Sequence, residues 1–259
     1  MSGFTGLKKE IQVMRFNLFL ALCFLVLIAV CHPIELPGSD LQSQSTTSES
    51  SSKGSQKSEA PLPYPVYKPP LRGMPDSRVG SSDRGSDSRY PLITALVPRH
   101  TGATVMEQPV LYWHLSRKCD YPIEITILDD TAVGPLWQTQ MSPPIEAGIH
   151  KIRLSDGKVR LAVGKTYKWF VAIIIDSEHR SKDIVAGGDI ERISLSSALQ
   201  ARLSDGSSQE NVSTYAEAGI WYDALNTLND MIAISPDRQH LKAEQAHLLK
   251  QVGIVLEEH

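Results

Sequence analysis

Cysteine is scarce in this chain. It has 259 residues and three cysteines, two of which, Cys23 and Cys31, lie in an apolar N-terminal stretch. Only Cys119 remains in the part that can fold, so an intramolecular disulfide there is excluded. Net charge is also small, because 26 basic residues nearly balance 29 acidic ones and leave −3. This balance provides no broad cationic field for nucleic acid, and we expect none to bind.

The sequence also lacks the short motifs of several enzyme classes. It contains no Gly-x-Ser-x-Gly, no Gly-x-x-x-x-Gly-Lys, no His-Glu-x-x-His and no glycine fingerprint for dinucleotides. These absences lower the odds of an enzyme without forbidding one. No cofactor and no metal are expected.

The N-terminus has the pattern of an export signal. Basic residues at 8, 9 and 15 precede an uncharged run from Phe16 to Cys31. As a helix this run would be about 24 Å long, shorter than the ~30 Å apolar core of a bilayer. Residues 1–33 are therefore predicted to be a secretory signal, with a retained anchor at 16–31 as the alternative. Met14 is a second possible start. Either reading places the rest of the chain outside the inner membrane, in the periplasm or beyond the cell, with membrane contact only through this segment.

Residues 34–89 have the composition of an unfolded spacer. Serine accounts for nine of the twenty residues from Ser39 to Ser58, and proline is frequent from 61 to 70. Such a segment has too little apolar surface to build a core. We predict a disordered Ser/Pro/Gly-rich spacer between the N-terminal segment and a folded part.

Residues 90–195 alternate apolar and polar side chains. Strands are expected at 92–97, 111–115, 121–127, 136–141, 149–154, 167–175 and 190–193. The run at 167–175 is apolar on both faces and should be a central strand. Gly187 and Gly188 are expected to turn or bulge the chain before the last strand. About seven short strands predict an antiparallel, immunoglobulin-like β-sandwich.

Residues 196–259 change to a helical period. Ser194 or Ser196 is the expected cap of a short helix that ends at Asp205-Gly206. The stretch from Tyr215 to Pro236 has the spacing of half a tetratricopeptide repeat, and a further helix capped by Asp237 should end near Gly253. One such unit cannot bury its own apolar face, so we expect this helical tail to pack on the sandwich. The predicted fold class is thus α+β.

Five short motifs occur in a specific order along the foldable part. They are Leu-Ile-Thr-Ala-Leu-Val-Pro at 92–98, Glu-Gln-Pro at 107–109, Tyr-Lys-Trp-Phe at 167–170, Arg-Ser-x-Asp at 180–183 and Gly-Ile-Trp-Tyr-Asp-Ala at 219–224. In these motifs the chain resembles an uncharacterised family of cyanobacterial exported proteins, domain of unknown function 928, over roughly residues 90–253. Family members often carry Cys where this chain has Ile175. The resemblance implies an exported protein with this layout and brings no activity with it.

The most polar cluster is the loop from Asp176 to Asp183. Its carboxylates beside His179 and Arg180 are suited to acid–base chemistry or to clamping an anion. The simpler interpretation is a strand-end loop that satisfies its own charges, and we favour it. If a ligand site exists, the candidates are Asp176, Arg180, Ser181, Asp183, Arg192 and Tyr222.

Two other clusters have simpler structural interpretations. His240, Glu244 and His247 share a helical stripe and are residue types that bind metals, but they are most simply the solvated edge of an amphipathic helix. Repeat spacing makes Trp221 a core residue and leaves Tyr222 as the more plausible contact.

These observations favour an exported, non-enzymatic interaction protein whose partner is another envelope or secreted protein. One alternative is a carbohydrate- or cell-wall-binding module that uses exposed aromatic residues such as Tyr222 or Tyr112. A second alternative is a hydrolase that uses the Asp176–Asp183 loop. The sequence does not identify the ligand or the oligomeric state.

Overall fold

The computed structural model describes residues 64–70, 77–80, 89–129 and 131–256. The predicted signal or anchor at 1–33 lies outside the described residues, as does most of the predicted spacer at 34–89. All described residues belong to one compact unit, Ala60–His259. Within them, no helix has both the length and the apolar character needed to cross a membrane.

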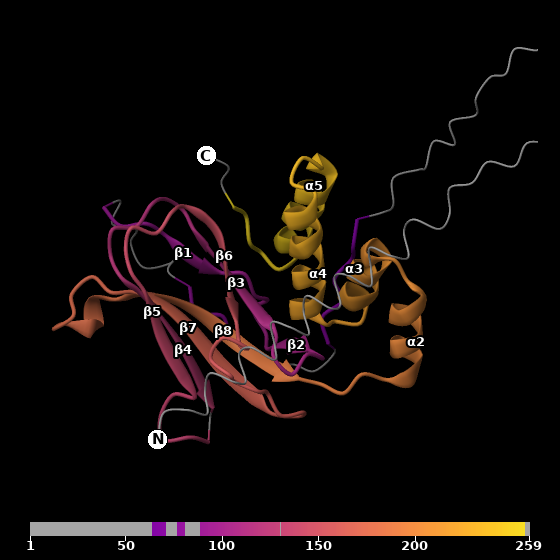
Figure 1. Ribbon diagram of the computed structural model, residues 1–259, viewed down its shortest axis with the longest axis horizontal. Helices are drawn as coiled ribbons and strands as arrows, with labels where there is room; N and C mark the ends of the chain where they lie inside the picture. The colour runs from indigo at the N-terminus through magenta and orange to yellow at the C-terminus, as the bar shows by residue number, and fades with distance from the viewer. Residues whose placement is uncertain (1–63, 71–76, 81–88, 130, 257–259) are drawn as a thin grey trace, which may run out of the picture. The chain divides into compact units, whose positions relative to one another are not determined.

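The described part of the chain has two β-sheets followed in sequence by four helices, which confirms the α+β class (Figure 1). The strands are β1 (Ile93–Ala95), β2 (Gly102–Thr104), β3 (Val110–Leu115), β4 (Ile123–Asp129), β5 (Trp137–Met141), β6 (Gly148–Arg153), β7 (Thr166–Ile173) and β8 (Ile184–Arg192). Strands form where the sequence has a period of two. In β4, for example, Ile123, Ile125 and Ile127 are buried and the residues between them are half-buried.

The small sheet has the order β1-β3-β6 and the large sheet the order β2-β8-β7-β4-β5. Paired strands are antiparallel except β2 and β8, which run parallel, so the prediction of a purely antiparallel arrangement is wrong at this edge. β2 was not predicted at all. Its Gly102 lies so close to the ring of Tyr222 that a Cβ atom there would come within 2.6 Å of a ring carbon. Close packing against this ring helps to hold the short strand at the sheet edge.

Strand β7 is central in the large sheet, as predicted, but β8 differs from the prediction. It runs without a break through Gly187 and Gly188, which were expected to turn or bulge the chain. A Cβ atom at Gly187 would lie 2.3 Å from the carbonyl oxygen of Trp169, and one at Gly188 would lie 2.7 Å from Cγ2 of Val97. The two glycines therefore allow close packing rather than a turn.

The helices are α2 (Ser197–Asp205), α3 (Ser208–Glu217), α4 (Trp221–Ile234) and α5 (Gln239–Gln251). Ser196 caps α2 by accepting the backbone N–H of Leu199, as predicted, and Gly206 follows its end. Ser207 and Glu210 form a capping box on α3. The N-cap of α5 is Arg238, which makes no side-chain cap, so the predicted Asp237 cap is wrong.

Helix α4 joins the helical layer to the sheets, and Figure 1 shows it beside β2 and β3. Trp221 is fully buried, as expected, and its indole N–H donates to the carbonyl of Leu96 at 2.9 Å. The indole N–H of Trp169 in β7 donates to the hydroxyl of Tyr222 at 2.9 Å. Because these bonds connect buried side chains of both layers, sheets and helices share one core.

Two short segments of the predicted spacer are described and are ordered. Residues 64–70 and 77–80 pack on the folded unit, which corrects the prediction for these two segments. Tyr67 is only 7% exposed and meets the Trp221 ring edge-on, with ring centres 5.0 Å apart. The Lys68 N–H donates to the carbonyl of Ala216 at 3.0 Å, and Val79 forms a β-bridge with Gly187. Each segment is held by one or two apolar residues. The average composition of the region, which is polar, therefore did not predict that these segments would be ordered.

Candidate functional site

The loop from Asp176 to Asp183 connects β7 and β8, and most of its charged side chains pair with one another. One carboxylate oxygen of Asp176 accepts a bond from Lys182 Nζ at 2.7 Å and lies 2.8 Å from Nδ1 of His179. The other accepts the backbone N–H of Glu178 at 3.0 Å. These contacts, that of Lys182 foremost, lower the pKa of Asp176 to about 2. Such a carboxylate is a weak general base, because it holds its proton poorly near neutral pH.

Arg180 fastens this loop to the large sheet. Its Nε donates to Asp183 at 2.6 Å and its Nη2 donates to Glu124 of β4 at 2.7 Å. The hydrogen bond from Arg180 lowers the pKa of Glu124. Ser181 lies in the short 3-10 helix η2 (Arg180–Lys182) and is exposed. This geometry matches the structural interpretation of the loop, in which the cation serves carboxylates of the same chain.

Arg192 lies at the opposite end of the β7–β8 hairpin from this loop. The register pairs Ile173 with Ile184 at the loop end and Thr166 with Glu191 at the other, so Arg192 cannot join Asp176 and Arg180 in one site. Its Nη1 donates to the carbonyl of Leu161 at 2.8 Å.

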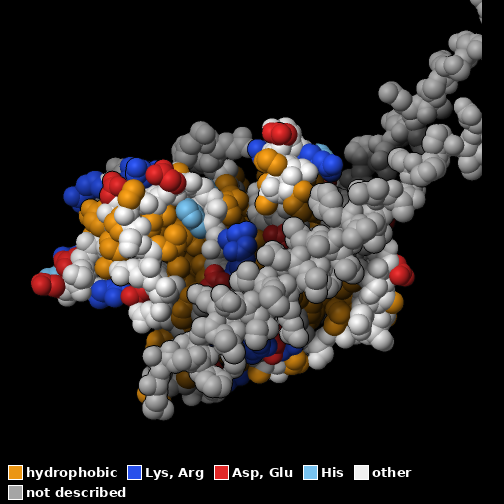
Figure 2. All heavy atoms as spheres, viewed as in Figure 1, with side chains coloured by type: hydrophobic (Ala, Val, Ile, Leu, Met, Phe, Trp, Pro, Cys, Tyr) orange, Lys and Arg blue, Asp and Glu red, His pale blue; other side chains and the backbone are white. Residues whose placement is uncertain are grey.

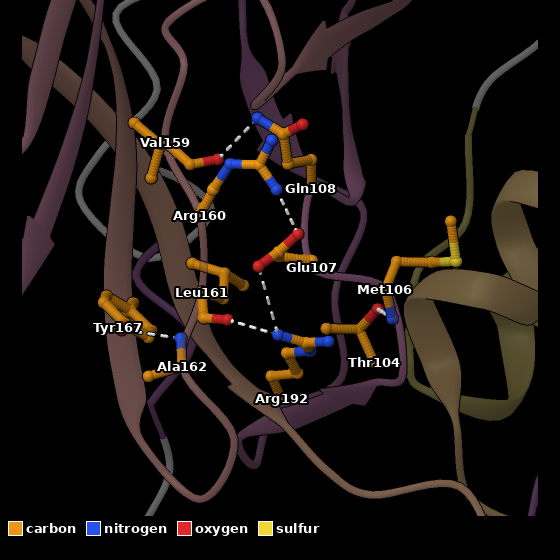
Figure 3. Close-up of polar contacts among 10 residues, drawn as sticks. All are labelled: Thr104, Met106, Glu107, Gln108, Val159, Arg160, Leu161, Ala162, Tyr167 and Arg192. Atoms are coloured by element: carbon orange, nitrogen blue, oxygen red, sulfur yellow. Dashed lines mark hydrogen bonds and ion pairs between the residues drawn. The ribbon is translucent and has the colours of Figure 1, made fainter.

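Arg192 and Arg160 both contact Glu107 (Figure 3). Arg192 lies 3.7 Å from this carboxylate, and Arg160 pairs with its other oxygen. The neighbouring Gln108 donates to the carbonyl of Val159 at 3.1 Å. Together these bonds hold the chain before β3 against the segment that precedes β7, which makes Arg192 a structural clamp.

Both aromatic candidates are buried, which corrects their prediction as surface contacts. Tyr222 is 2% exposed and Tyr112 is 4% exposed. The Tyr222 hydroxyl donates to the carbonyl of Asp189 at 3.1 Å, and that of Tyr112 donates to Asn226 at 2.9 Å. A side chain whose polar end is satisfied inside the protein is not available to stack on a sugar ring.

The His240, Glu244 and His247 stripe also differs from its prediction. Glu244 is only 4% exposed and accepts a bond from Gln209 Nε2 at 2.6 Å, so it is not part of a solvated edge. His247 stacks on Tyr64, with ring centres 4.9 Å apart. In the described ranges, no three potential ligands gather closely enough to hold a metal ion.

A cleft of about 760 Å³, here called the sheet–helix cleft, lies between the small sheet and helices α4 and α5. Its sheet wall is formed by the almost fully buried Tyr112 and the half-buried His114 of β3 and by Ile149 and Lys151 of β6. These residues are cross-strand neighbours, because Tyr112 pairs with Lys151 and His114 with Ile149. They occupy the face of the sheet opposite to the buried Trp113, which faces the other way along the same strand.

The helix wall of the sheet–helix cleft combines apolar residues with polar ones such as Asn229 and Gln245. Ile232 of α4 and Leu249 of α5 line it, together with the small, exposed Ala243 and Ala246. Ile254, just after α5, adds to the apolar lining. The space-filling view shows the surface hollowed between the small sheet and α5 (Figure 2).

The charged side chains among the described lining residues of the sheet–helix cleft have one sign. Lys151 on the sheet side and Lys242 and Lys250 on α5 are exposed, and His114 and His247 lie beside them. Among the described residues that line the cleft, none is acidic. An apolar floor with a cationic rim is suited to an amphiphilic, negatively charged ligand.

A protein-family model described as Domain of Unknown Function (DUF928) matches residues 78–257. The chain belongs to the DUF928 family. The family region begins at Arg78, whose guanidinium donates to the carbonyls of Val252 at 3.0 Å and Val97 at 3.3 Å. It thus includes part of the segment predicted as spacer, and it contains every strand and helix described here. No curated protein matches the chain.

The sheet–helix cleft is the feature of this DUF928 chain that the sequence did not reveal. Its lining comes from two strands, two helices and the segment after α5, which are far apart along the chain. A weak signal was present in Ala243 and Ala246, small residues of α5 that lie between its two lysines in the sequence and do not belong to the core. Only the packing of α4 on the sheet brings these residues opposite β6.

Proposed function

We propose that the chain is an exported, non-enzymatic interaction module of the cell envelope and that the sheet–helix cleft holds a segment of a partner protein. The observation that carries this proposal is an apolar cleft of about 760 Å³ with charged groups at its rim. Protein interfaces have this composition, with an apolar centre that excludes water and a polar edge. Export rests on the basic and apolar N-terminal pattern of the sequence.

We also propose a more specific assignment of the fold. The two sheets are proposed to form an immunoglobulin-like sandwich, supported by the shared core that contains Trp113 and Trp169. Helices α3 and α4 are proposed to be a tetratricopeptide-type hairpin followed by one more helix, α5. The tight turn at Gly219, where φ is +74°, and the buried Trp221 directly after it support this interpretation.

The two alternatives have less support. A carbohydrate-binding module was to use Tyr222 or Tyr112, and both are buried. A hydrolase was to use Asp176 and Asp183, which are paired with Lys182 and Arg180.

The test is site-specific cross-linking of the full chain in its native cells. A photoreactive phenylalanine analogue replaces Ala243 in the cleft, and cross-linked proteins are identified by mass spectrometry. Ala246→Trp, which fills the cleft, should abolish the adduct because its indole occupies the space of the partner.

The matched control is Ala201→Trp, which changes an exposed alanine of α2 that does not line the cleft. It should leave the adduct and the melting temperature unchanged. Equal labelling in both tryptophan variants would mean that the captured protein does not occupy the cleft, and the proposal would fail.

A further inference from the structure

We infer that the partner segment in the sheet–helix cleft is an amphipathic helix with acidic residues on its polar flanks. This inference rests on the proposed function and specifies the chemistry of the partner. It follows from the charge of the rim, the shape of the walls and the hydrogen-bonding needs of a buried backbone.

The lysines at the rim of the cleft make it complementary to an acidic partner. Lys151 stands on the sheet wall, and Lys242 and Lys250 stand on the helix wall, so cations flank the apolar floor on both sides. On α5 the two lysines are eight residues apart, which is about 12 Å along the helix. A partner helix that lies along α5 would pair with both lysines if its carboxylates were seven or eight residues apart, which is about two helical turns.

Among the described residues that line the cleft, none supplies such a carboxylate. Asp230 lies close enough to help raise the pKa of Tyr112, after the larger effect of burial, but it accepts a bond from Asn226 Nδ2 at 3.1 Å. Arg153 acts on the same tyrosine in the opposite direction. Asp230 does not line the cleft, so the charged side chains that an incoming acidic group meets among the described lining residues are lysines.

The second step is the secondary structure of the occupant. The cleft residues of β3 and β6 project from the face of the small sheet, as the pairs Tyr112–Lys151 and His114–Ile149 show. An extended strand placed over a face finds no backbone partner there, and its buried N–H and C=O groups would be costly. A helix satisfies these groups internally and presents only side chains.

The third step is close approach. Ala243 and Ala246 are small, exposed residues of α5 that line the cleft, and the apolar Ile232 and Leu249 line it beside them. Small residues at a helix contact allow an axis separation at the short end of about 8–10 Å. The best-fitting partner helix has large apolar residues at positions i, i+3, i+4 and i+7.

The test begins with the segment that cross-links at position 243, prepared as a labelled peptide and titrated into the full chain. We expect a helical segment with apolar residues at helical spacing and Asp or Glu on its flanks. Lys242→Glu with Lys250→Glu should weaken its binding about tenfold or more, and added salt should weaken binding to the unmodified chain.

The charge-matched control is Lys68→Glu with Arg238→Glu, two exposed cations outside the cleft. This pair should change the affinity by less than about twofold. If Ala246→Trp abolishes binding but the reversal at Lys242 and Lys250 does not, the acidic helix is wrong while the occupied cleft stands. If Ala246→Trp has no effect, both proposals fail.

Two further results would overturn the inference. A cross-linked segment that is extended or basic would exclude an acidic helix. The second is that no peptide binds while oleate binds saturably and Ala246→Trp abolishes the oleate binding. The cleft would then be a site for a small anionic amphiphile.

Discussion

Trp169 of the central strand donates its indole N–H to the hydroxyl of Tyr222 on helix α4, and this bond connects the two layers of the protein in its interior. The same hydroxyl donates to the carbonyl of Asp189 in β8 at 3.1 Å. Burial raises the pKa of Tyr222, so the hydroxyl stays protonated and keeps both roles. One side chain thus satisfies two polar groups of the large sheet.

Tyr222→Phe should lower the free energy of unfolding by about 1–3 kcal/mol, because it leaves a buried donor and a buried acceptor without their partner. Equilibrium denaturation with urea measures this change. Tyr64→Phe is the control, since Tyr64 is 47% exposed and its hydroxyl can bond to water. Equal stability of the two variants would contradict the role given to Tyr222.

The sequence misassigned Tyr222 for a physical reason. Helical spacing identifies one buried stripe, and on that basis Trp221 was correctly placed in the core. Helix α4, however, is covered by α3 and α5 as well as by the sheets, so its first five residues are all buried. A prediction that assumes a single buried face therefore places Tyr222 at the surface, whereas the packing of α3, α5 and the sheets buries it.

The same limit applies to the strands. Alternation identified β4, and an apolar run without alternation identified β7, because both strands bury rows of side chains. Strand β2 has only Gly102, Ala103 and Thr104, and pairing with β8 holds it in place. The sheet–helix cleft could not be predicted for a related reason, since no local pattern specifies which helix face will stand opposite β6.

Asp223 gives the protein a testable pH dependence. Its carboxyl is 5% exposed, and burial raises its pKa from 3.8 to about 6, against smaller lowering effects of bonds from Thr104 and Val105. The folded protein thus binds this proton more tightly than the unfolded chain does. Its stabilising effect is full below about pH 4 and is lost as the pH rises through 6.

Asp223→Asn should therefore gain stability relative to the unmodified protein as the pH rises. With about 1.4 kcal/mol for each pKa unit, the difference between the two proteins should change by about 2–2.5 kcal/mol from pH 4 to pH 7.5. Urea denaturation at several pH values measures it. A difference that does not vary with pH would mean that the carboxyl titrates normally.

Tyr67 anchors the segment that precedes the sheets. Its ring meets Trp221, and its hydroxyl lies 2.9 Å from Nε2 of His100. Gln251 clamps the adjacent backbone, accepting the Tyr67 N–H and donating to the carbonyl of Pro65, each at 2.8 Å.

Tyr67→Ala should lower the free energy of unfolding by about 2–4 kcal/mol, because it leaves a cavity beside Trp221. It should also speed proteolytic cleavage near residue 67, since the segment loses its main apolar contact. Val66→Ala is the control, because Val66 is 53% exposed. If both variants were cleaved at the rate of the unmodified chain, the segment would not be held by Tyr67.

Gly188 tests the close packing of β8 on the chain after β1. Gly188→Ala should destabilise the protein by about 1–3 kcal/mol, because its new methyl group would lie 2.7 Å from Cγ2 of Val97. Removing that group with Val97→Ala should relieve the clash, so the double variant should be more stable than the sum of the single losses predicts, by about 1 kcal/mol. Gly134→Ala, which has open space around it, controls for the loss of glycine itself. Strictly additive losses at 188 and 97 would mean that the strand shifts to absorb the methyl group, and that the glycine is not required by this contact.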